Sequence, residues 1–368
     1  MVSEVSVRQK NSIILDNRQL KMGRIFFLIL FCVSVVAFGQ KREESAEVQD
    51  SVSVPGIVVV KERQARVITS EVGSGEYSGI THVGGSRYAV VHDHLNGGGV
   101  LLFDIQISDK GIVKEVSKSV PAGTASSEVK HMDNEGVAYV PSTETLFVSA
   151  ESDQSIREYT LDGVPTGRML AVPSDMAADK ITSNRGFEAL AYNAVTGLFW
   201  TTTESELIAD AATPGLLRLQ SFGNDLQPRK RYLYQMDSGT KSAEKIANAS
   251  SYVHGVSAMA AMDDGRIIVL EREVYVPKGS VIKKMLSSFS KIKLYVVRPS
   301  ADSSAVLEKT LLKSFSTSSA NMANYEGMCF GPTLPNGNKT LILIPDSQNG
   351  AHGLTQEYLK VLVLGIEN

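Results

Sequence analysis

The chain has 368 residues, of which 43% are hydrophobic and 21% are charged, proportions that are ordinary for a globular protein. The formal net charge of −3 excludes the basic footprint of a nucleic-acid-binding protein and gives no sign of a polybasic membrane surface. The sequence lacks the glycine-rich phosphate-binding motifs of nucleotide sites, so we expect no nucleotide cofactor.

The N-terminal residues differ from the rest of the chain. Lys21 and Arg24 precede a short apolar run over residues 25–38, which is typical of a secretory signal. We therefore predict a signal peptide over residues 1–40, with Met22 as an alternative start. A retained N-terminal anchor is the alternative interpretation.

The composition changes again after the signal. Residues 41–55 are polar and without periodicity, which indicates a flexible leader, and residues 56–368 make up the predicted domain. On this interpretation the protein is exported to the periplasm or the extracellular space. No other segment is long and apolar enough to span a membrane after signal removal.

A strand-pair unit recurs five times in the predicted domain. Each copy opens with Ser or Glu, then Gly or Ala, and continues as a short strand, a turn and a second strand rich in large apolar residues. Turn residues such as Asp264-Gly265 and Asn336-Gly337 separate the two strands. The copies begin at Ser78, Glu135, Glu188, Ser257 and Glu326.

Further strands follow each pair. The third strands are predicted over residues 100–107, 156–161, 216–221, 292–297 and 359–364, and fourth strands over 113–119, 168–172, 231–236 and 307–315. The fifth unit lacks a fourth strand, whereas Ile57–Ile68 is a strand without a partner. We therefore predict an all-β propeller of about five four-stranded blades, closed by the N-terminal strand joining the C-terminal blade. A sixth, degenerate blade is the alternative.

Helices are expected only in loops between strands. The two best candidates are residues 241–251 and 279–290. The second residue of each copy is small, which is expected where first strands crowd around an axis and backbones approach closely. These residues are Gly79, Gly136, Ala189, Ala258 and Gly327.

Acidic side chains open three of the five copies. In a propeller Glu135, Glu188 and Glu326 would converge on the axis at one mouth. Carboxylates that lie so close must take up protons, pair with a cationic side chain or bind a metal ion. Oxygen ligands suit Ca²⁺ or another divalent cation, so these three residues are the predicted metal ligands. The alternative is that each accepts hydrogen bonds from backbone N–H groups of the next blade.

A second column of acids ends the second strands. Its predicted members are Asp93, Glu151, Glu204, Glu271 and Asp346. Glu204, Glu271 and Asp346 are candidate substrate-binding residues, although strand-end carboxylates also commonly hold loops. Arg272 could clamp a phosphate or carboxylate, because its planar fork suits bidentate anions, or it could form a salt-bridge cluster with its acidic neighbours.

Histidines supply candidate acid–base groups. On a continuous strand His92 and His94 would face one side and Asp93 the other, where a metal ligand or an acid–base pair could form. His254 should share the face of the repeat glutamates. The candidate catalytic residues are therefore His92, Asp93, His254 and Arg272.

Three motifs resemble one family. Gly186-Phe187-Glu188-Ala189-Leu190-Ala191, Ile267-Ile268-Val269-Leu270-Glu271-Arg272 and Asn324-Tyr325-Glu326-Gly327-Met328 are similar to the phytase-like family, described as "esterase-like activity of phytase". The resemblance spans roughly Gly56 to Gly365.

The resemblance has implications for function. It implies an extracytoplasmic propeller that is a calcium-dependent phosphoric-ester hydrolase, and by position it points to Glu188, Glu271, Arg272 and Glu326, with Ser78 and Asp93 where the first repeat matches. Ala189 replaces the usual Gly and Ser257 replaces an acid.

We therefore expect a metal-assisted ester hydrolase, monomeric, acting on a small ester or phosphoester at the axial mouth. The rival hypotheses are a non-catalytic propeller that binds a glycan, peptide or surface partner, and a metal-dependent lactonase.

Overall fold

A computed structural model describes residues 56–130, 132–300, 302–318, 321–348 and 355–366. The predicted signal peptide and leader lie outside the described residues. Residues Gln49–Asn368 form one compact unit. Within the described ranges, no helix has the length and apolar character needed to cross a bilayer.

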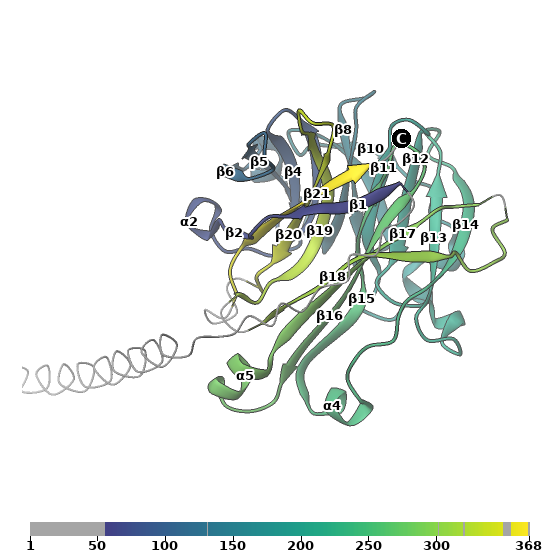
Figure 1. The fold of residues 1–368 in the computed structure, drawn as a ribbon. Helices are drawn as coiled ribbons and strands as arrows, with labels where there is room; N and C mark the ends of the chain where they lie inside the picture. The colour runs from purple at the N-terminus through teal and green to yellow at the C-terminus, as the bar shows by residue number, and fades with distance from the viewer. Residues whose placement is uncertain (1–55, 131, 301, 319–320, 349–354, 367–368) are drawn as a thin grey trace, which may run out of the picture. The chain divides into compact units, whose positions relative to one another are not determined.

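The domain is a five-bladed β-propeller, as the repeats predict (Figure 1). Blade 1 contains β3 (Tyr77–Gly84), β4 (Arg87–His92), β5 (Val100–Ile107) and β6 (Val113–Ser119). Blade 2 contains β7 (Asn134–Val140), β8 (Thr145–Ala150), β9 (Ser155–Thr160) and β10 (Pro165–Met169). Blade 3 contains β11 (Phe187–Asn193), β12 (Leu198–Thr203), β13 (Leu216–Phe222) and β14 (Pro228–Gln235).

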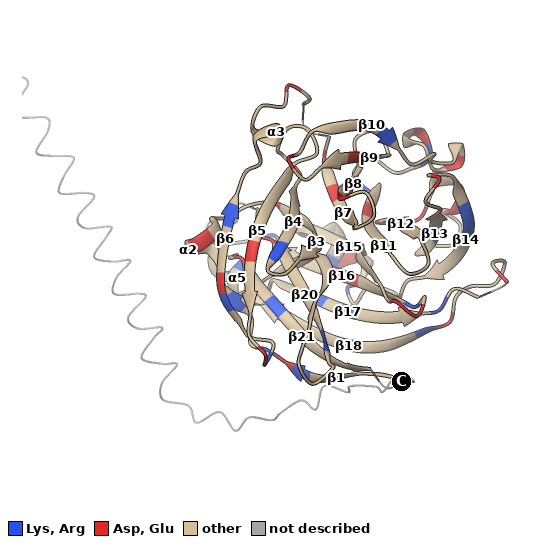
Figure 2. Ribbon diagram, turned by 90° about the horizontal axis from the view of Figure 1, so that it is seen from above, with Lys and Arg blue, Asp and Glu red and all other residues tan. Residues whose placement is uncertain are grey.

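The last two blades complete the ring. Blade 4 contains β15 (Ala249–Ala261), β16 (Ile267–Pro277), β17 (Phe289–Val297) and β18 (Lys309–Ser318). Blade 5 combines β19 (Asn324–Thr333), β20 (Lys339–Asp346) and β21 (Tyr358–Ile366) with the N-terminal β1 (Ile57–Glu62). The first strands β3, β7, β11, β15 and β19 contact one another around the centre (Figure 2).

The N-terminal strand closes the ring as predicted. β1 runs antiparallel to β21, with Ile57 opposite Ile366 and Glu62 opposite Leu362, and the short β2 (Arg66–Val67) also pairs with β21. The strand that begins the propeller thus completes the blade that ends it, so the first and last strands of the domain pair with each other. Every strand that closes the ring lies inside the compact unit that begins at Gln49.

Short helices occupy the loops. They are α2 (Thr69–Val72), α3 (Ala122–Ala125), α4 (Ala243–Ala247) and α5 (Val281–Ser287), with 3-10 turns η1 (Ser174–Met176), η2 (Ala178–Lys180) and η3 (Ile208–Asp210). α4 and α5 lie within the two predicted helical loops. β10 starts three residues earlier than the predicted strand and its five residues are all exposed, so no apolar pattern marks it.

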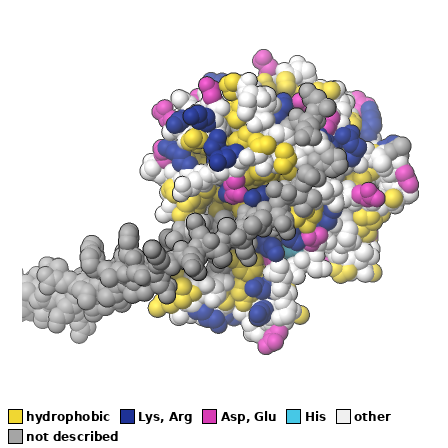
Figure 3. All heavy atoms as spheres, viewed as in Figure 1, with side chains coloured by type: hydrophobic (Ala, Val, Ile, Leu, Met, Phe, Trp, Pro, Cys, Tyr) yellow, Lys and Arg dark blue, Asp and Glu magenta, His cyan; other side chains and the backbone are white. Residues whose placement is uncertain are grey.

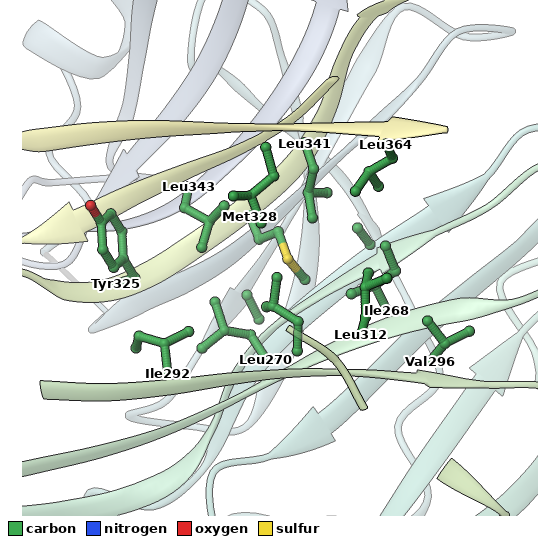
Figure 4. Close-up of a cluster of buried hydrophobic side chains, with 14 of the residues drawn as sticks. Ile268, Leu270, Ile292, Val296, Leu312, Tyr325, Met328, Leu341, Leu343 and Leu364 are labelled. Atoms are coloured by element: carbon green, nitrogen blue, oxygen red, sulfur yellow. The ribbon is translucent and has the colours of Figure 1, made fainter. Parts of the chain in front are cut away.

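The hydrophobic core lies between adjacent blades. Figure 4 shows the cluster between blades 4 and 5, where Leu270 and Ile292 face Met328 and Leu343. Four further clusters fill the other blade interfaces. Burying each of these large side chains contributes about 1.5–3 kcal/mol, which fixes the blades and hence the loops at the axial mouth.

Candidate functional site

Each first strand carries a β-bulge at the same place. The pairing register shifts between Tyr77 and Gly79 in blade 1, and equivalent shifts occur in the other four blades. A bulge bends the strand and re-aims the side chain of the extra residue, and bulges are common beside active sites. The bulged residues form what we call the bulge ring, which contains Ser78, Glu135, Glu188, Ser257 and Glu326.

The small residues that follow the bulge ring allow the first strands to approach closely. A Cβ atom added to Gly79 would lie 2.4 Å from the Glu135 carbonyl oxygen of the next blade. One added to Gly136 would lie 2.7 Å from the Leu190 backbone nitrogen. The predicted crowding around the axis is therefore present, and it holds the bulge ring together.

The second-strand column contains four acids and one arginine. In blade 3 the residue before the bulge, Phe187, pairs with Thr203, so the next residue of the second strand is Glu204. In blade 4 the residue before the bulge, Val256, pairs with Glu271, so the equivalent next residue is Arg272. The prediction that Glu271 is the fifth member is thus wrong by one residue. The strand-end ring, as we call it, contains Asp93, Glu151, Glu204, Arg272 and Asp346.

Glu271 lies on the other face of its strand, because successive side chains alternate. It accepts hydrogen bonds from Tyr234 Oη at 2.7 Å, from Lys309 Nζ at 2.7 Å and from the backbone N–H of Asp237 at 3.2 Å. It is absent from the lining of the axial cavity. Its contacts are those of a structural residue that joins blades 3 and 4.

All members of the two rings except Ser78 and Ser257 line a cavity of about 680 Å³ at the axial mouth. Its described lining includes nine carboxylates against three Lys or Arg side chains. The carboxylates belong to Glu76, Asp93, Asp133, Glu135, Glu151, Glu188, Glu204, Glu326 and Asp346, and the basic residues are Arg185, Arg272 and Lys284. One wall is apolar and comes from Val253, Val274, Val276 and Val281 of blade 4.

Arg272 neutralises one half of this cavity. Its guanidinium is 3.0 Å from Glu204 Oε1 and 3.8 Å from Glu188 Oε1, and it also forms an ion pair with Glu326. The residue is only 5% exposed. Burial lowers the pKa of Arg272, but the charges of Glu204 and Glu188 outweigh this effect and raise that pKa overall. Arg272 thus joins blades 3, 4 and 5, and its guanidinium group is paired with carboxylates of the protein itself.

Glu135 lies in the other half of the cavity. Its side chain is 8% exposed, lines the cavity and has no hydrogen bond or ion pair among the described residues. Burial raises the pKa of Glu135 well above its ordinary value, and the charges of Glu151, Asp93 and Asp133 raise it further. A buried carboxylate without a partner must hold a proton or bind a cation.

Asp93 and Asp133 approach Glu135 closely. One ligand atom from each of the three residues lies within 4.8 Å of the others, a spacing at which all three could hold one ion. Glu76, Asp93 and His94 form a second group of the same kind, so Asp93 belongs to both. Burial raises the pKa of Asp93, but hydrogen bonds from His92 and His94 outweigh this effect and hold that pKa below its ordinary value.

The histidine triplet is arranged differently from the predicted alternation. β4 ends at His92, and the following turn brings both Asp93 and His94 to the cavity, with His94 Nδ1 2.7 Å from Asp93 Oδ1. Strand alternation therefore stops before His94. His92 is absent from the described lining; its Nδ1 lies 3.3 Å from Asp93 Oδ1 and 3.2 Å from the His94 backbone nitrogen, and its ring packs edge-on to Tyr77.

His254 is also absent from the described lining of the cavity. Its neighbour Val253 lines the cavity instead, because Val253 pairs with Val274 and lies two residues from Gly255, the partner of Arg272, so alternation puts Val253 on the cavity face and His254 on the other face. Of the ten residues predicted from the sequence, the structure brings together Asp93, Glu135, Glu188, Glu204, Arg272, Glu326 and Asp346 at the cavity. It leaves out His92, His254 and Glu271.

Two strand-end acids act as staples. Glu151 accepts a hydrogen bond from the backbone N–H of Gly186, which leads into blade 3, and Asp346 accepts one at 2.6 Å from the backbone N–H of Gln348. Burial raises the pKa of Glu151 to about 7 and that of Asp346 to about 6. These contacts fit the alternative in which strand-end carboxylates hold loops.

The sequence analysis did not single out the cavity residues Glu76, Asp133 and Arg185, and it considered His94 only as part of the histidine triplet. Glu76 and Asp133 precede first strands by one residue, and Arg185 lies in the equivalent approach to β11. The signal that could have found them is a polar residue just ahead of each repeat.

The fold and the cavity define a five-bladed β-propeller with an acidic axial site. The family model described as "Phytase-like: Esterase-like activity of phytase" matches residues 72–348, so the chain belongs to the phytase-like family. This match confirms the resemblance carried by the three motifs. No curated protein matches the chain.

Several solved structures are similar to the chain at low identity. Mala s 1, the major allergen of Malassezia sympodialis, has 12% identity and a TM-score of 0.37, with 80% of this chain and 81% of that chain covered. A member of the DUF4221 family from Bacteroides vulgatus has 8% identity and a TM-score of 0.41, with 85% and 98% covered. A nidogen/laminin complex has 11% identity and a TM-score of 0.34, with 80% and 87% covered.

Proposed function

We propose that this protein is an exported ester hydrolase that works with a divalent cation held by Asp93, Asp133 and Glu135. Membership of the phytase-like family supports a hydrolase role. The observation that carries the cation site is Glu135, a buried carboxylate that faces the cavity and has no partner among the described residues. Three carboxylates within 4.8 Å of one another make a hard oxygen donor set of the kind that Ca²⁺ prefers.

This ligand set differs from the predicted trio in two members. Arg272 forms ion pairs with Glu188 and Glu326, whereas its charge acts on Glu135 only from beyond ion-pair distance. A cation bound at Asp93, Asp133 and Glu135 would supply Lewis acidity to polarise an ester or phosphoester. The chain's own residues would then orient the ligand set, position the substrate and move protons.

The contacts of the cavity residues suggest a different role for each of them. Arg272 fixes Glu188, Glu204 and Glu326 and so keeps three carboxylates away from the substrate. Lys284 and Arg185 are the remaining basic groups of the lining and could contact an anionic part of the substrate. The Asp93 carboxylate raises the pKa of His94, which makes the imidazole a proton donor at the cavity.

Cation binding is tested first, without any substrate. Protein treated with a chelator is titrated with Ca²⁺, Mg²⁺ and Mn²⁺ by calorimetry and by thermal denaturation, because an ion that binds only the folded state stabilises it. Glu135→Gln should weaken binding at least tenfold. Glu357→Gln is the matched control, since Glu357 is also a buried glutamate but is absent from the described cavity lining, and it should bind as the wild type does.

Hydrolysis is tested with p-nitrophenyl acetate, p-nitrophenyl phosphate and a simple lactone, with and without the bound ion. Cation-dependent release of product that Glu135→Gln abolishes supports the proposal. Cleavage of lactones alone would favour a lactonase. Cation binding without hydrolysis of any of these would favour a binding propeller, and a wild type that neither binds a cation nor hydrolyses an ester would overturn the proposal.

A further inference from the structure

Blade 4 extends beyond the other blades. Its first two strands pair from Ala249 opposite Pro277 as far as Ala261 opposite Ile267, and their outer part projects past the bulge at Ser257. α4 and α5 lie at the end of this projection (Figure 1). We call residues 240–254 and 273–291 the blade-4 arm.

α5 presents an exposed apolar face at the end of the arm. Val281, Ile282, Met285 and Leu286 are 67%, 68%, 45% and 74% exposed. Their spacing places them on one side of the helix, while the helix packs against β16 and β18. The other large exposed apolar residues of the described chain, such as Val195 and Ile208, lie singly or in pairs elsewhere.

The arm is basic, although the chain as a whole is acidic. It contains six lysines and two glutamates, whereas the whole chain has a net charge of −3. Glu273 is buried and accepts hydrogen bonds from Tyr252 Oη at 3.1 Å and from the Thr240 N–H at 2.7 Å, so its charge is directed inward. In Figure 3 hydrophobic and basic side chains lie next to one another at this end of the domain.

Helix geometry arranges the lysines around the apolar face. At about 100° per residue, Lys284 falls beside Val281 and Lys283 falls beside Leu286, so one lysine flanks each side of the apolar face. Lys241 lies over the rings of Tyr275 and Phe289, at 5.0 and 4.6 Å from their centroids. Apolar side chains bordered by lysines are the pattern of helices that lie in a membrane interface.

We propose that the blade-4 arm docks on the surface of an anionic lipid bilayer. The apolar face of α5 would enter the headgroup region, and the lysines would contact anionic headgroups. Charge and composition favour this occupant over another protein, because lysine is depleted in protein–protein interfaces and enriched on membrane-surface helices. Because Val281 and Lys284 also line the axial cavity, docking places the cavity mouth beside the membrane.

The docking proposal does not depend on the hydrolase proposal, and its test measures binding alone. Vesicles of phosphatidylglycerol mixed with phosphatidylcholine are sedimented with protein at low and high salt, beside vesicles of phosphatidylcholine only. The chain from Gln49 onward is used, because it contains every strand that closes the ring and lacks the apolar N-terminal segment; the full chain is measured beside it. We expect at least tenfold stronger binding to the anionic vesicles, lost at high salt.

Paired variants separate the arm from the rest of the surface. Ile282→Ser with Leu286→Ser should weaken binding at least tenfold, whereas Val195→Ser with Ile208→Ser, which removes equally exposed apolar side chains elsewhere, should leave it unchanged. Circular dichroism should show all variants folded, since every altered side chain is exposed.

A second pair tests the charges. Lys278→Glu with Lys283→Glu should weaken binding at least tenfold, and Lys110→Glu with Lys114→Glu, the same change on exposed lysines of blade 1, should have a smaller effect. The proposal is overturned if the wild type binds neither vesicle, or if both control pairs lose as much binding as the arm variants. It is also overturned if ultracentrifugation shows a dimer that requires Ile282 and Leu286 while no vesicle binding occurs, because a second copy would then cover the apolar face.

Discussion

Removing Arg272 should destabilise the protein in a way that depends on pH. Arg272→Met keeps an unbranched apolar stem but deletes the guanidinium that contacts Glu188, Glu204 and Glu326. Glu204 keeps Arg185 at 2.5 Å, so two buried carboxylates lose their basic partner. Breaking a buried ion pair by removing one member costs about 3–5 kcal/mol, and we expect a loss of that size at neutral pH.

The sign of the pH effect follows from Glu188. Burial and neighbouring carboxylates raise the pKa of Glu188 and the charge of Arg272 lowers it, so removing Arg272 raises that pKa further and the folded state holds a proton that the unfolded chain has released. Stability of the variant should therefore increase as the pH falls, and the difference from wild type should be larger at about pH 8 than at about pH 5.

Urea denaturation at both pH values, followed by the fluorescence of the buried Trp200, measures this difference. Arg298→Met is the control, because the Arg298 side chain is 62% exposed and lies 3.6 Å from Asp264; it should change stability by less than about 1 kcal/mol. A loss below about 1 kcal/mol for Arg272→Met, or an equal loss at both pH values, would refute the assigned role of Arg272.

Three further changes test other parts of the fold. Burial raises the pKa of Glu357 to about 8 from its ordinary 4.5, so the wild type should lose stability as the pH rises between these values, and Glu357→Gln should flatten that slope in thermal denaturation; parallel profiles would contradict the assignment. Gly136→Val places a Cβ 2.7 Å from the Leu190 backbone nitrogen and should cost about 1–3 kcal/mol or more in urea denaturation, an expectation that wild-type stability would disprove. Ile57→Asp puts a charge in the buried core where β1 closes the ring, so native-state proteolysis should become much faster; unchanged resistance would show that closure by β1 is dispensable.

The sequence predicts the ring well because the repeat encodes it. The strand at residues 100–107 follows from its apolar run, and the closure by Ile57 onward follows from an unpaired N-terminal strand and a last unit that lacks its fourth strand. β10 was misplaced because its ladder with β9 carries no apolar pattern and its residues are all exposed. Patterns reveal strands that bury a face, and they miss strands held by backbone pairing alone.

The site was harder to predict because one residue of register decides which side chain reaches the axis. The five bulges interrupt the alternation of the first strands at the ring itself, and within β15 the pairing of Val253 with Val274 shows that His254 faces away from the cavity. Glu271 and Arg272 are adjacent, and only the pairing of Val256 with Glu271 shows that Arg272 belongs to the strand-end ring. Asp133 was missed because it precedes its strand and belongs to no repeat position.

Blade 4 concentrates the departures from the repeat. It has Ser257 where three blades have glutamate, and Arg272 where the other four have an acid. It alone carries the basic arm with its apolar helix, and it supplies the valines of the cavity wall. A ring of five equal acidic blades would gather carboxylates at the axis with no counter-charge, which is unfavourable unless they bind protons or ions.

Arg272 reduces that difficulty on the side of blades 3, 4 and 5, because it forms ion pairs with three of the carboxylates, while burial and neighbouring carboxylates still raise the pKa of Glu188. On the side of blades 1 and 2, Glu135 has no hydrogen bond or ion pair among the described residues, so this side still requires a cation. One exceptional blade thus divides a near-symmetric ring into a structural half and a half that is free to bind. If the same ring had glutamate at Ser257 and an acid at Arg272, we would expect it to require bound cations merely to fold.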